Sequence, residues 1–178
     1  GLAYDFMAVG EFKLVTAASD GFEIQVRYEP VEGTSISLTT AVATRVGSAR
    51  VSFTAGETLT LKVDGATVDL ADGATQQVGT GAVTRQNNEY TLFFATGDKM
   101  IIANNGPGPQ FGAFFDVDIT LADSRTSGSV AGLLGNKDGD PGNDLSLSGG
   151  TNLGSTASFE QIHRTLADSW RITQAESL

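Results

Sequence analysis

The chain has 178 residues, of which 40% are apolar, so it is long and hydrophobic enough to bury a core without cross-links and is not intrinsically disordered. Its formal charge is −10 at pH 7, which makes nucleic acid and anionic membrane surfaces unfavourable partners and favours cations. Cysteine is absent, which excludes thiol catalysis, disulfides and thiolate metal sites. The longest apolar runs are too short to span a bilayer, so we expect no membrane insertion.

The first two thirds of the chain are predicted to form antiparallel strands. Apolar and polar residues alternate through residues 22–28, 59–64 and 115–121, the pattern of strands with one buried face. Turn-forming pairs such as Gly47-Ser48 separate the alternating runs. We therefore expect an all-β fold, an antiparallel β-sandwich of roughly ten strands between residues 11 and 121, within a single domain spanning residues 1–178.

One C-terminal amphipathic helix is predicted between Ser158 and Ile172. Four apolar residues recur at helical spacing on one face: Phe159, Ile162, Leu166 and Trp170. Ser158 followed by Gln161 has the spacing of a capping box. We expect the helix to pack this face on the sheet, with Trp170 as its structural anchor, and residues 173–178 to form a frayed tail.

An acidic loop after the last predicted strand concentrates the potential metal ligands. Five side chains with oxygen donors fall within nine residues: Asn136, Asp138, Asp140, Asn143 and Asp144. Donors that are spaced two residues apart along an irregular loop direct alternate oxygens toward one centre. A donor set made of oxygen alone suits Ca²⁺ rather than a transition metal. Lys137 is expected to point outward, because its ammonium would compete with the ion.

Two interpretations of the acidic loop stay open. The spacing does not match an EF-hand, because the sixth and twelfth positions counted from Asn136 are Pro141 and Leu147 rather than glycine and glutamate. Three close aspartates repel one another unless a cation neutralises them, which favours a calcium site. The alternative is a solvated turn rich in Asp and Asn.

Catalysis is not expected. One histidine without cysteine provides no set of nucleophile, base and orienting residue, and His163 is interpreted as a packing residue beside the apolar helix face. Asp116 and Asp118 alternate with apolar residues, which places both on the solvent side of one strand. The turn-rich segment 104–112 is interpreted as a connector, with a contact loop as the alternative.

Several motifs, taken in chain order, resemble the von Willebrand factor type D (VWD) domain family. The acidic loop and its lead-in read G-L-L-G-N, then D-G-D, then N-D, where the family carries G-L-C-G-N-x-D-G followed by N-D. Further similar stretches lie at residues 4–6, 10–12, 22–30, 40–47 and 169–171. The resemblance covers nearly the whole chain. It implies a calcium-stabilised extracellular structural or adhesion module that mediates protein–protein interaction within a larger secreted or surface protein.

The departures from the family pattern carry expectations of their own. Animal members have cysteines where this chain has Phe12 and Leu134, so the resemblance implies that these two side chains meet as an apolar substitute and that the chain is a bacterial-type member. Family members also carry a first strand ending in F-D-G, whose glycine matches Gly1. The rest of that first strand is absent here, which implies an open sheet edge near the strand from Gly10 to Val15. Another extracellular protein or a neighbouring domain would fill that edge by β-augmentation.

An alternative function is a carbohydrate-binding β-sandwich. Sugars stack on aromatic rings that are exposed on a protein surface. The candidate stacking platforms are Tyr4, Tyr28, Tyr90 and Trp170.

Overall fold

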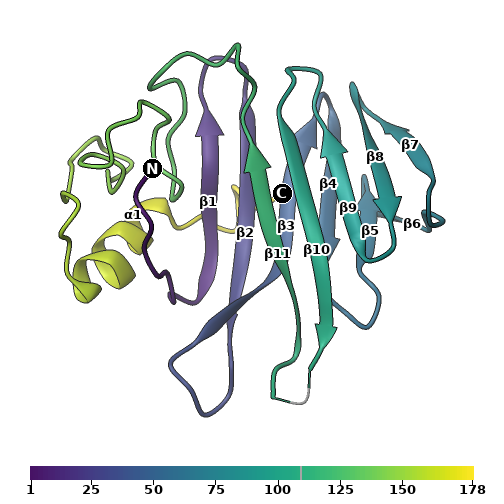
Figure 1. The fold of residues 1–178 in the computed structure, drawn as a ribbon, viewed down its shortest axis with the longest axis horizontal. Helices are drawn as coiled ribbons and strands as arrows, with labels where there is room; N and C mark the ends of the chain where they lie inside the picture. Colours follow the sequence, from purple (N-terminus) through teal and green to yellow (C-terminus); the bar gives the residue numbers. More distant parts are fainter. Residues whose placement is uncertain (109) are drawn as a thin grey trace. The chain divides into compact units, whose positions relative to one another are not determined.

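The computed structural model describes residues 1–108 and 110–178 and is all-β with a short C-terminal helix (Figure 1). The described strands fall into a six-stranded and a five-stranded antiparallel sheet, so the predicted all-β antiparallel class is confirmed. In chain order the strands are β1 (Gly10–Ala17), β2 (Phe22–Pro30), β3 (Ser37–Val46), β4 (Ala49–Thr54), β5 (Thr60–Val63), β6 (Ala66–Val68), β7 (Thr75–Val78), β8 (Gly81–Gln86), β9 (Glu89–Phe93), β10 (Lys99–Pro107) and β11 (Ala113–Thr120).

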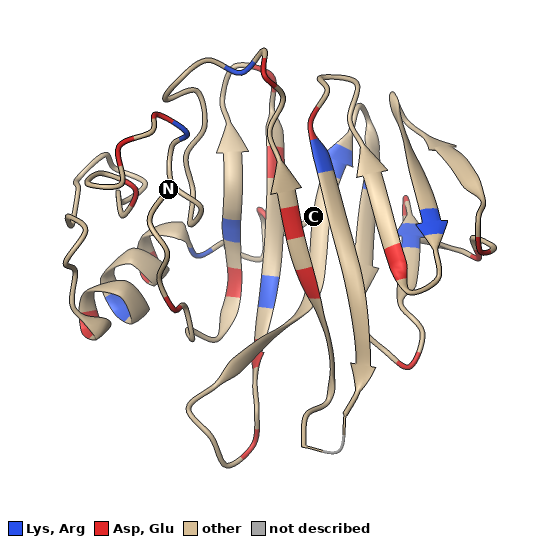
Figure 2. Cartoon of the chain, in the orientation of Figure 1, with Lys and Arg blue, Asp and Glu red and all other residues tan. Residues whose placement is uncertain are grey.

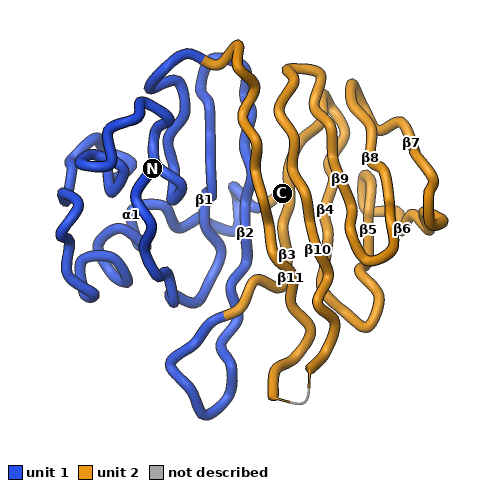
Figure 3. The backbone as a smooth tube through the Cα atoms, in the orientation of Figure 1, with its two compact units in different colours: residues 1–37, 126–177 blue, residues 38–125, 178 orange. Residues whose placement is uncertain are grey.

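The backbone forms two compact units (Figure 3). The first unit contains residues 1–37 and 126–177, with β1, β2, the acidic loop and the C-terminal helix. The second unit contains residues 38–125 and 178, with the remaining strands.

The second unit is a β-sandwich built from consecutive antiparallel strands. Strands β3 to β6 pair in chain order, as do β7 to β11. The rings of Phe53 on β4 and Tyr90 on β9 meet edge to face, with centroids 5.9 Å apart. At Gly79 (φ 55°) an added Cβ would lie 1.8 Å from the carbonyl oxygen of Val46, so the turn between β7 and β8 approaches β3 as closely as only glycine permits.

The acidic residues of β11 face solvent as predicted. Asp116 and Asp118 are exposed, whereas Phe115 on the same strand is 1% exposed. The acidic residues of β11 are the red bands on that strand in Figure 2. Part of the segment 104–112 is not a loop, because β10 continues through Pro107. Pro109, within the same segment, lies outside the described residues.

The first unit is built on the pairing of β1 with β2, which fully buries Phe12, Val15 and Ile24, among others. The C-terminal helix opens with two α-helical residues, Phe159 and Glu160, passes through a π-helical segment, η1 (Gln161–Leu166), and continues as α1 (Ala167–Trp170). The predicted capping box is confirmed, because the Ser158 amide donates to Gln161 Oε1 at 2.8 Å and the Gln161 amide donates to Ser158 Oγ at 3.3 Å.

The prediction that Phe159 shares the buried helix face is wrong. Leu166 and Trp170 are buried, but the Phe159 side chain is 69% exposed. The π-helical turn holds more residues than an α-helical turn, so a residue placed on the buried face by α-helical spacing is rotated toward solvent. The Phe159 ring instead stacks on His163 at 3.8 Å, and His163 also lies against Phe6, which gives it the expected packing role.

The C-terminal tail, which was expected to be frayed, is held in place as far as Glu176. The Thr173 amide and hydroxyl donate to Glu176 Oε2 at 3.0 and 2.9 Å. The Glu176 carbonyl accepts a bond from Gln25 Nε2 at 2.8 Å, and its carboxylate pairs with Lys13 at 3.1 Å. These contacts with β1 and β2 explain why a short polar tail is held, which its composition alone did not indicate.

The edge of β1 is closed by this chain's own residues, so β-augmentation from Gly10 to Val15 is contradicted. The amide and carbonyl of Thr16 bond to Ala131, and the Leu133 and Leu134 amides donate to the Lys13 and Leu14 carbonyls. Farther along the same edge, the Ile172 amide donates to the Glu11 carbonyl at 3.0 Å. Backbone from two distant segments therefore occupies the hydrogen-bonding positions that a partner strand would need.

Candidate metal centre

The acidic loop starts from a fixed point on β1. Its lead-in, residues 131–134, bonds to the backbone of β1 as described above. Gly132 has φ 142°, and a Cβ there would lie 2.5 Å from the Leu14 carbonyl oxygen. Glycine is therefore required at the first position of the G-L-L-G-N motif, because only a bare backbone fits this close to the strand.

The lead-in buries Leu133 and not Leu134. Leu133 is 2% exposed, whereas Leu134 is 55% exposed. The two leucines are the central residues of a turn that the Gly135 amide closes on the Gly132 carbonyl at 3.2 Å, and in this turn Leu133 is on the inner side. The expectation that Phe12 and Leu134 form a buried apolar pair is therefore wrong: Phe12 is in the core, and Leu134 faces solvent.

Three of the five predicted ligands form one hydrogen-bonded cluster. Asn136 Nδ2 donates to Asn143 Oδ1 at 2.8 Å and to Asp138 Oδ2 at 3.1 Å. Asn143 Nδ2 donates to the same Asp138 oxygen at 2.7 Å. The bonds from Asn143 and from the Asp140 amide are the main causes that lower the pKa of Asp138, so this exposed carboxylate is ionised at neutral pH.

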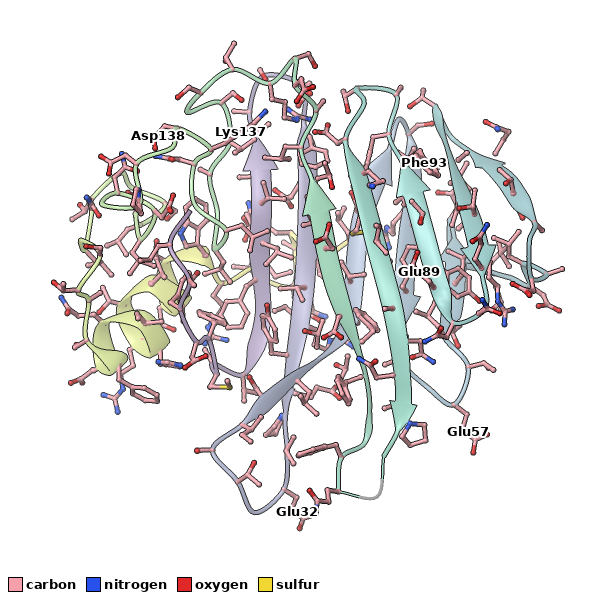
Figure 4. All side chains as sticks on the ribbon, in the orientation of Figure 1. Glu32, Glu57, Glu89, Phe93, Lys137 and Asp138 are labelled. Carbon is pink, nitrogen blue, oxygen red and sulfur yellow. The ribbon has the colours of Figure 1, made fainter. Side chains whose placement is uncertain are left out.

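The regular spacing of the loop produces a series of Asx turns. Asn136 Oδ1 accepts from the Asp138 amide at 3.1 Å, and Asp138 Oδ1 accepts from the Asp140 amide at 2.7 Å. Asp140 Oδ1 accepts from the Gly142 amide at 2.8 Å. The side chain two residues earlier thus holds each turn. Lys137 is exposed, and Figure 4 shows it next to Asp138 in the loop.

Asp144, the fifth predicted ligand, is directed to the start of the chain. It is 7% exposed, and its Oδ2 accepts the Leu2 amide hydrogen at 2.6 Å. Gly135 has φ 85°, and a Cβ there would lie 2.4 Å from Asp144 Oδ1, so glycine makes room for this carboxylate. Tyr4 continues the contact by donating its hydroxyl to the Leu133 carbonyl. Burial is the main cause that raises the pKa of Tyr4, and the negative charge of Asp144 adds to it.

The structure therefore gathers the predicted ligands into two neighbouring groups of the same unit. Asn136, Asp138 and Asn143 form one group, and Asp140 is tied to it through the Asx turn with Asp138 and through its carbonyl, which accepts from the Asn143 amide at 3.3 Å. Asp144 lies with the N-terminal segment. Among residues 1–108 and 110–178, no three His, Cys, Asp or Glu side chains stand close enough to hold a metal together.

Trp170 has the anchoring position predicted for it. It is 6% exposed, and its Nε1 donates to the Ser146 carbonyl at 2.9 Å. The Ser148 amide donates to Ser169 Oγ at 2.6 Å. The helix is thus joined to the stretch that directly follows Asp144.

The proposed stacking platforms for sugars are not open aromatic faces. Trp170 and Tyr90 are buried, at 6% and 4% exposed. Tyr28 is half-buried, and its ring packs against Phe6 at 5.5 Å. Tyr4, also half-buried, is held by Leu133. Any sugar site must therefore rely on polar groups rather than on these four rings.

Sequence reasoning missed two participants of this region. The Leu2 amide reaches Asp144 from 142 positions away, and Gly135 leaves the space that the Asp144 carboxylate occupies. The signal available in the sequence was glycine at position 135 directly before Asn136, which indicates a position where the backbone approaches another group.

Comparison with known proteins agrees with the motifs. The model of the von Willebrand factor type D domain matches residues 1–151, which is most of the chain. Domains of this family are extracellular protein-interaction modules of a structural, non-enzymatic kind. No curated protein matches the chain. Within the part of the chain that the structure describes, no helix has the length and hydrophobicity needed to cross a membrane.

Proposed function

This chain belongs to the von Willebrand factor type D family, and from that premise we propose that it is a calcium-stabilised module of a larger secreted or surface protein. The module mediates interaction with another extracellular protein or with neighbouring domains of its parent chain. Because it lacks cysteine, we place it among bacterial-type members, and a bound metal ion would stabilise a chain that can form no disulfide.

The observation that carries the proposal is the cluster of Asn136, Asp138 and Asn143. Two amides and one ionised carboxylate meet within hydrogen-bonding distance in an exposed loop. Each amide group carries an oxygen as well as an NH₂ group, so rotation of the side chain presents oxygen to a cation. Oxygen donors of this kind are the ligands that Ca²⁺ prefers.

Asp144 and Asp140 extend this donor set. Asp144 is buried against Gly135 and the Leu2 amide, where its negative charge has little access to water. A nearby cation would offset the cost of burying that charge. Calcium takes six to eight oxygens, so backbone carbonyls or water would supply the positions that these five side chains leave open.

The role proposed for the ion is structural. The loop runs from the segment paired with β1 to the stretch that Trp170 and Ser169 hold on the C-terminal helix. An ion bound in this loop would neutralise its aspartates and fix the connection between those two elements. The chemistry supplied by calcium is electrostatic and requires no reaction at the site.

Isothermal titration of Ca²⁺ into protein freed of metal by a chelator tests the binding directly. We expect one ion per chain, and we expect Asp138→Ala to weaken binding by at least about tenfold, because it removes the only carboxylate of the cluster. Asp5→Ala is the matched control, since Asp5 is also exposed and belongs to the same unit but lies outside the loop. The absence of a calcium-binding isotherm, or equal affinities for all three proteins, would contradict the proposed site.

A further inference from the structure

A pocket of about 300 Å³ lies in the β-sandwich of the second unit, away from the acidic loop in sequence. Three connections enclose it: residues 56–59 between β4 and β5, the segment containing Asp72 between β6 and β7, and the turn between β8 and β9. Tyr90 on β9 and Asn104 on β10 form its inner wall. Its volume is at the lower end of the range for small-molecule sites.

Asn104 is the unusual member of this pocket. The residue is 7% exposed, and most of its polar groups are engaged: its Nδ2 donates to the Gly56 carbonyl at 3.2 Å, and its backbone pairs with Asn88. Its Oδ1, however, is buried and has no hydrogen-bond partner among the described residues. A buried acceptor without a donor is unfavourable, so a ligand O–H or N–H group brought to this oxygen would satisfy it.

The rest of the pocket is held in place by hydrogen bonds. Arg85 donates from Nη1 to the Leu70 carbonyl at 2.9 Å and from Nε to the Asn87 carbonyl at 3.0 Å. Asp72 Oδ1 accepts from the Asn87 amide at 2.6 Å. The side chains of the pocket wall therefore lose little conformational freedom when a ligand binds. A small site needs this low entropic cost to bind its ligand with measurable affinity.

We propose that this pocket binds a neutral sugar residue, recognised through its hydroxyl groups. Acceptors at Asn104, Asp72 and Glu57 line the same pocket as donors at Arg85 and the asparagines, and a hydroxyl group satisfies both kinds of partner. The guanidinium of Arg85 disfavours a cationic ligand, and the two carboxylates disfavour an anionic one. Tyr90 acts as a wall rather than a stacking platform, because Arg85 lies over its ring at 5.4 Å and Phe53 meets it edge to face.

The probes for the test are glucose, galactose and N-acetylglucosamine, added at up to tens of millimolar to ¹⁵N-labelled chain and followed by amide chemical shifts. We expect at least one of them to bind with millimolar affinity, with the shifts confined to residues 56–59, 72, 85–90 and 104. Butylammonium and acetate serve as the cationic and anionic probes. The proposal would be overturned if none of the three sugars changed the amide chemical shifts. It would also be overturned if only butylammonium or acetate shifted these amides.

Two variants with a matched control separate the pocket from the rest of the surface. Glu57→Ala removes a rim carboxylate that is exposed, and Asn104→Ala removes the unpaired acceptor. We expect each to weaken sugar binding, Asn104→Ala by about tenfold or more. Glu89→Ala, an exposed carboxylate on β9 that does not line the pocket, is expected to bind as the unaltered chain does (Figure 4).

If Asn104→Ala disturbs the fold, the comparison of Glu57→Ala with Glu89→Ala decides the outcome alone. Equal affinities of Glu57→Ala and Glu89→Ala would then overturn the proposal. The titration is run both in calcium and in chelator. Sugar shifts that persist in chelator separate this pocket from the calcium site, so failure of one proposal leaves the other standing.

Discussion

The carboxylate of Asp144 accepts a hydrogen bond from the amide of Leu2 at 2.6 Å, joining residues that are 142 positions apart. The contact fastens the N-terminal segment to the end of the acidic loop, and Gly135 provides the space for it. The loop is therefore linked to three parts of its unit: β1 through residues 131–134, the helix through Trp170, and the start of the chain through Asp144.

The contact between Asp144 and Leu2 should contribute to the free energy of unfolding even when no metal is bound. In chelator, we expect Asp144→Ala to lower the free energy of unfolding by roughly 1–3 kcal/mol, because it removes a buried acceptor and leaves the Leu2 amide without its partner. Urea unfolding measures the difference. Asp5→Ala, an exposed carboxylate on the same N-terminal segment, should change it by less than about 0.5 kcal/mol. Equal effects of the two substitutions would contradict the account.

Gly135 and Gly139 offer a comparison that isolates the space around Asp144. Their φ angles are 85° and 86°, so alanine introduces similar backbone strain at both. A Cβ at Gly135 meets Asp144 Oδ1 at 2.4 Å, whereas a Cβ at Gly139 meets nothing within 4 Å. In urea unfolding we expect Gly135→Ala to be more destabilising than Gly139→Ala by about 1 kcal/mol or more. A larger loss for Gly139→Ala would show that the close approach to Asp144 is not limiting.

The second unit contains a buried ion pair between Asp98 and Arg125. Arg125 Nη2 lies 2.6 Å from Asp98 Oδ2, and the two side chains are 6% and 0% exposed, respectively. Burial tends to raise the pKa of Asp98, but hydrogen bonds from Arg125, Thr96 and the Ala122 amide outweigh it and lower the pKa. We expect Arg125→Met to cost about 3–5 kcal/mol in urea unfolding, because it leaves a buried carboxylate unpaired. The double variant Asp98→Leu with Arg125→Met should recover part of this loss.

The same pair predicts a pH dependence. Because the folded-state pKa of Asp98 is lowered, its stabilising contribution is complete above the unfolded-state pKa of about 3.9 and is lost as pH falls through the folded-state value. Asp98→Asn should therefore show a shallower loss of stability below about pH 4 than the unaltered chain. Parallel acid-unfolding curves would contradict this assignment.

Glu176 tests the docking of the C-terminal tail. Bonds from the Thr173 amide and hydroxyl, followed by the contact with Lys13, lower its pKa to about 2. An NMR titration of the Glu176 carboxyl should give a midpoint near that value, and Lys13→Ala should move it upward because one partner is lost. A midpoint near 4.5, the ordinary value for glutamate, would indicate that the tail is frayed after all.

The alternation of residues in the strands predicted the fold class, because each strand buries one face locally and its pattern can be read from a few neighbours. The capping box at Ser158 was predictable for the same reason. The exposure of Phe159 could not be predicted, since nothing in the spacing of apolar residues indicated that the helix would contain a π-helical segment.

The closing of the β1 edge could not be read from the sequence. The residues that cover it, Ala131 and Ile172, are each more than 100 positions from their partners on β1. The burial of Leu133 in place of Leu134 depends on that same contact with β1 and on the turn over residues 132–135. For the candidate site, residue types and spacing indicated the donors, whereas the grouping of Asn136 with Asn143 and of Asp144 with Leu2 required the folded backbone.

Thermal unfolding of the metal-free chain, in millimolar calcium and in excess chelator, tests the calcium-stabilised role most directly. Because calcium would bind the folded loop and not the unfolded chain, it should stabilise by about 2.7 kcal/mol at one hundred times Kd, which raises Tm by roughly 5–10 °C. Asp144→Ala should abolish most of that increase, and Asp5→Ala should preserve it. Superimposable melting curves of the unaltered chain in calcium and in chelator would contradict the calcium site.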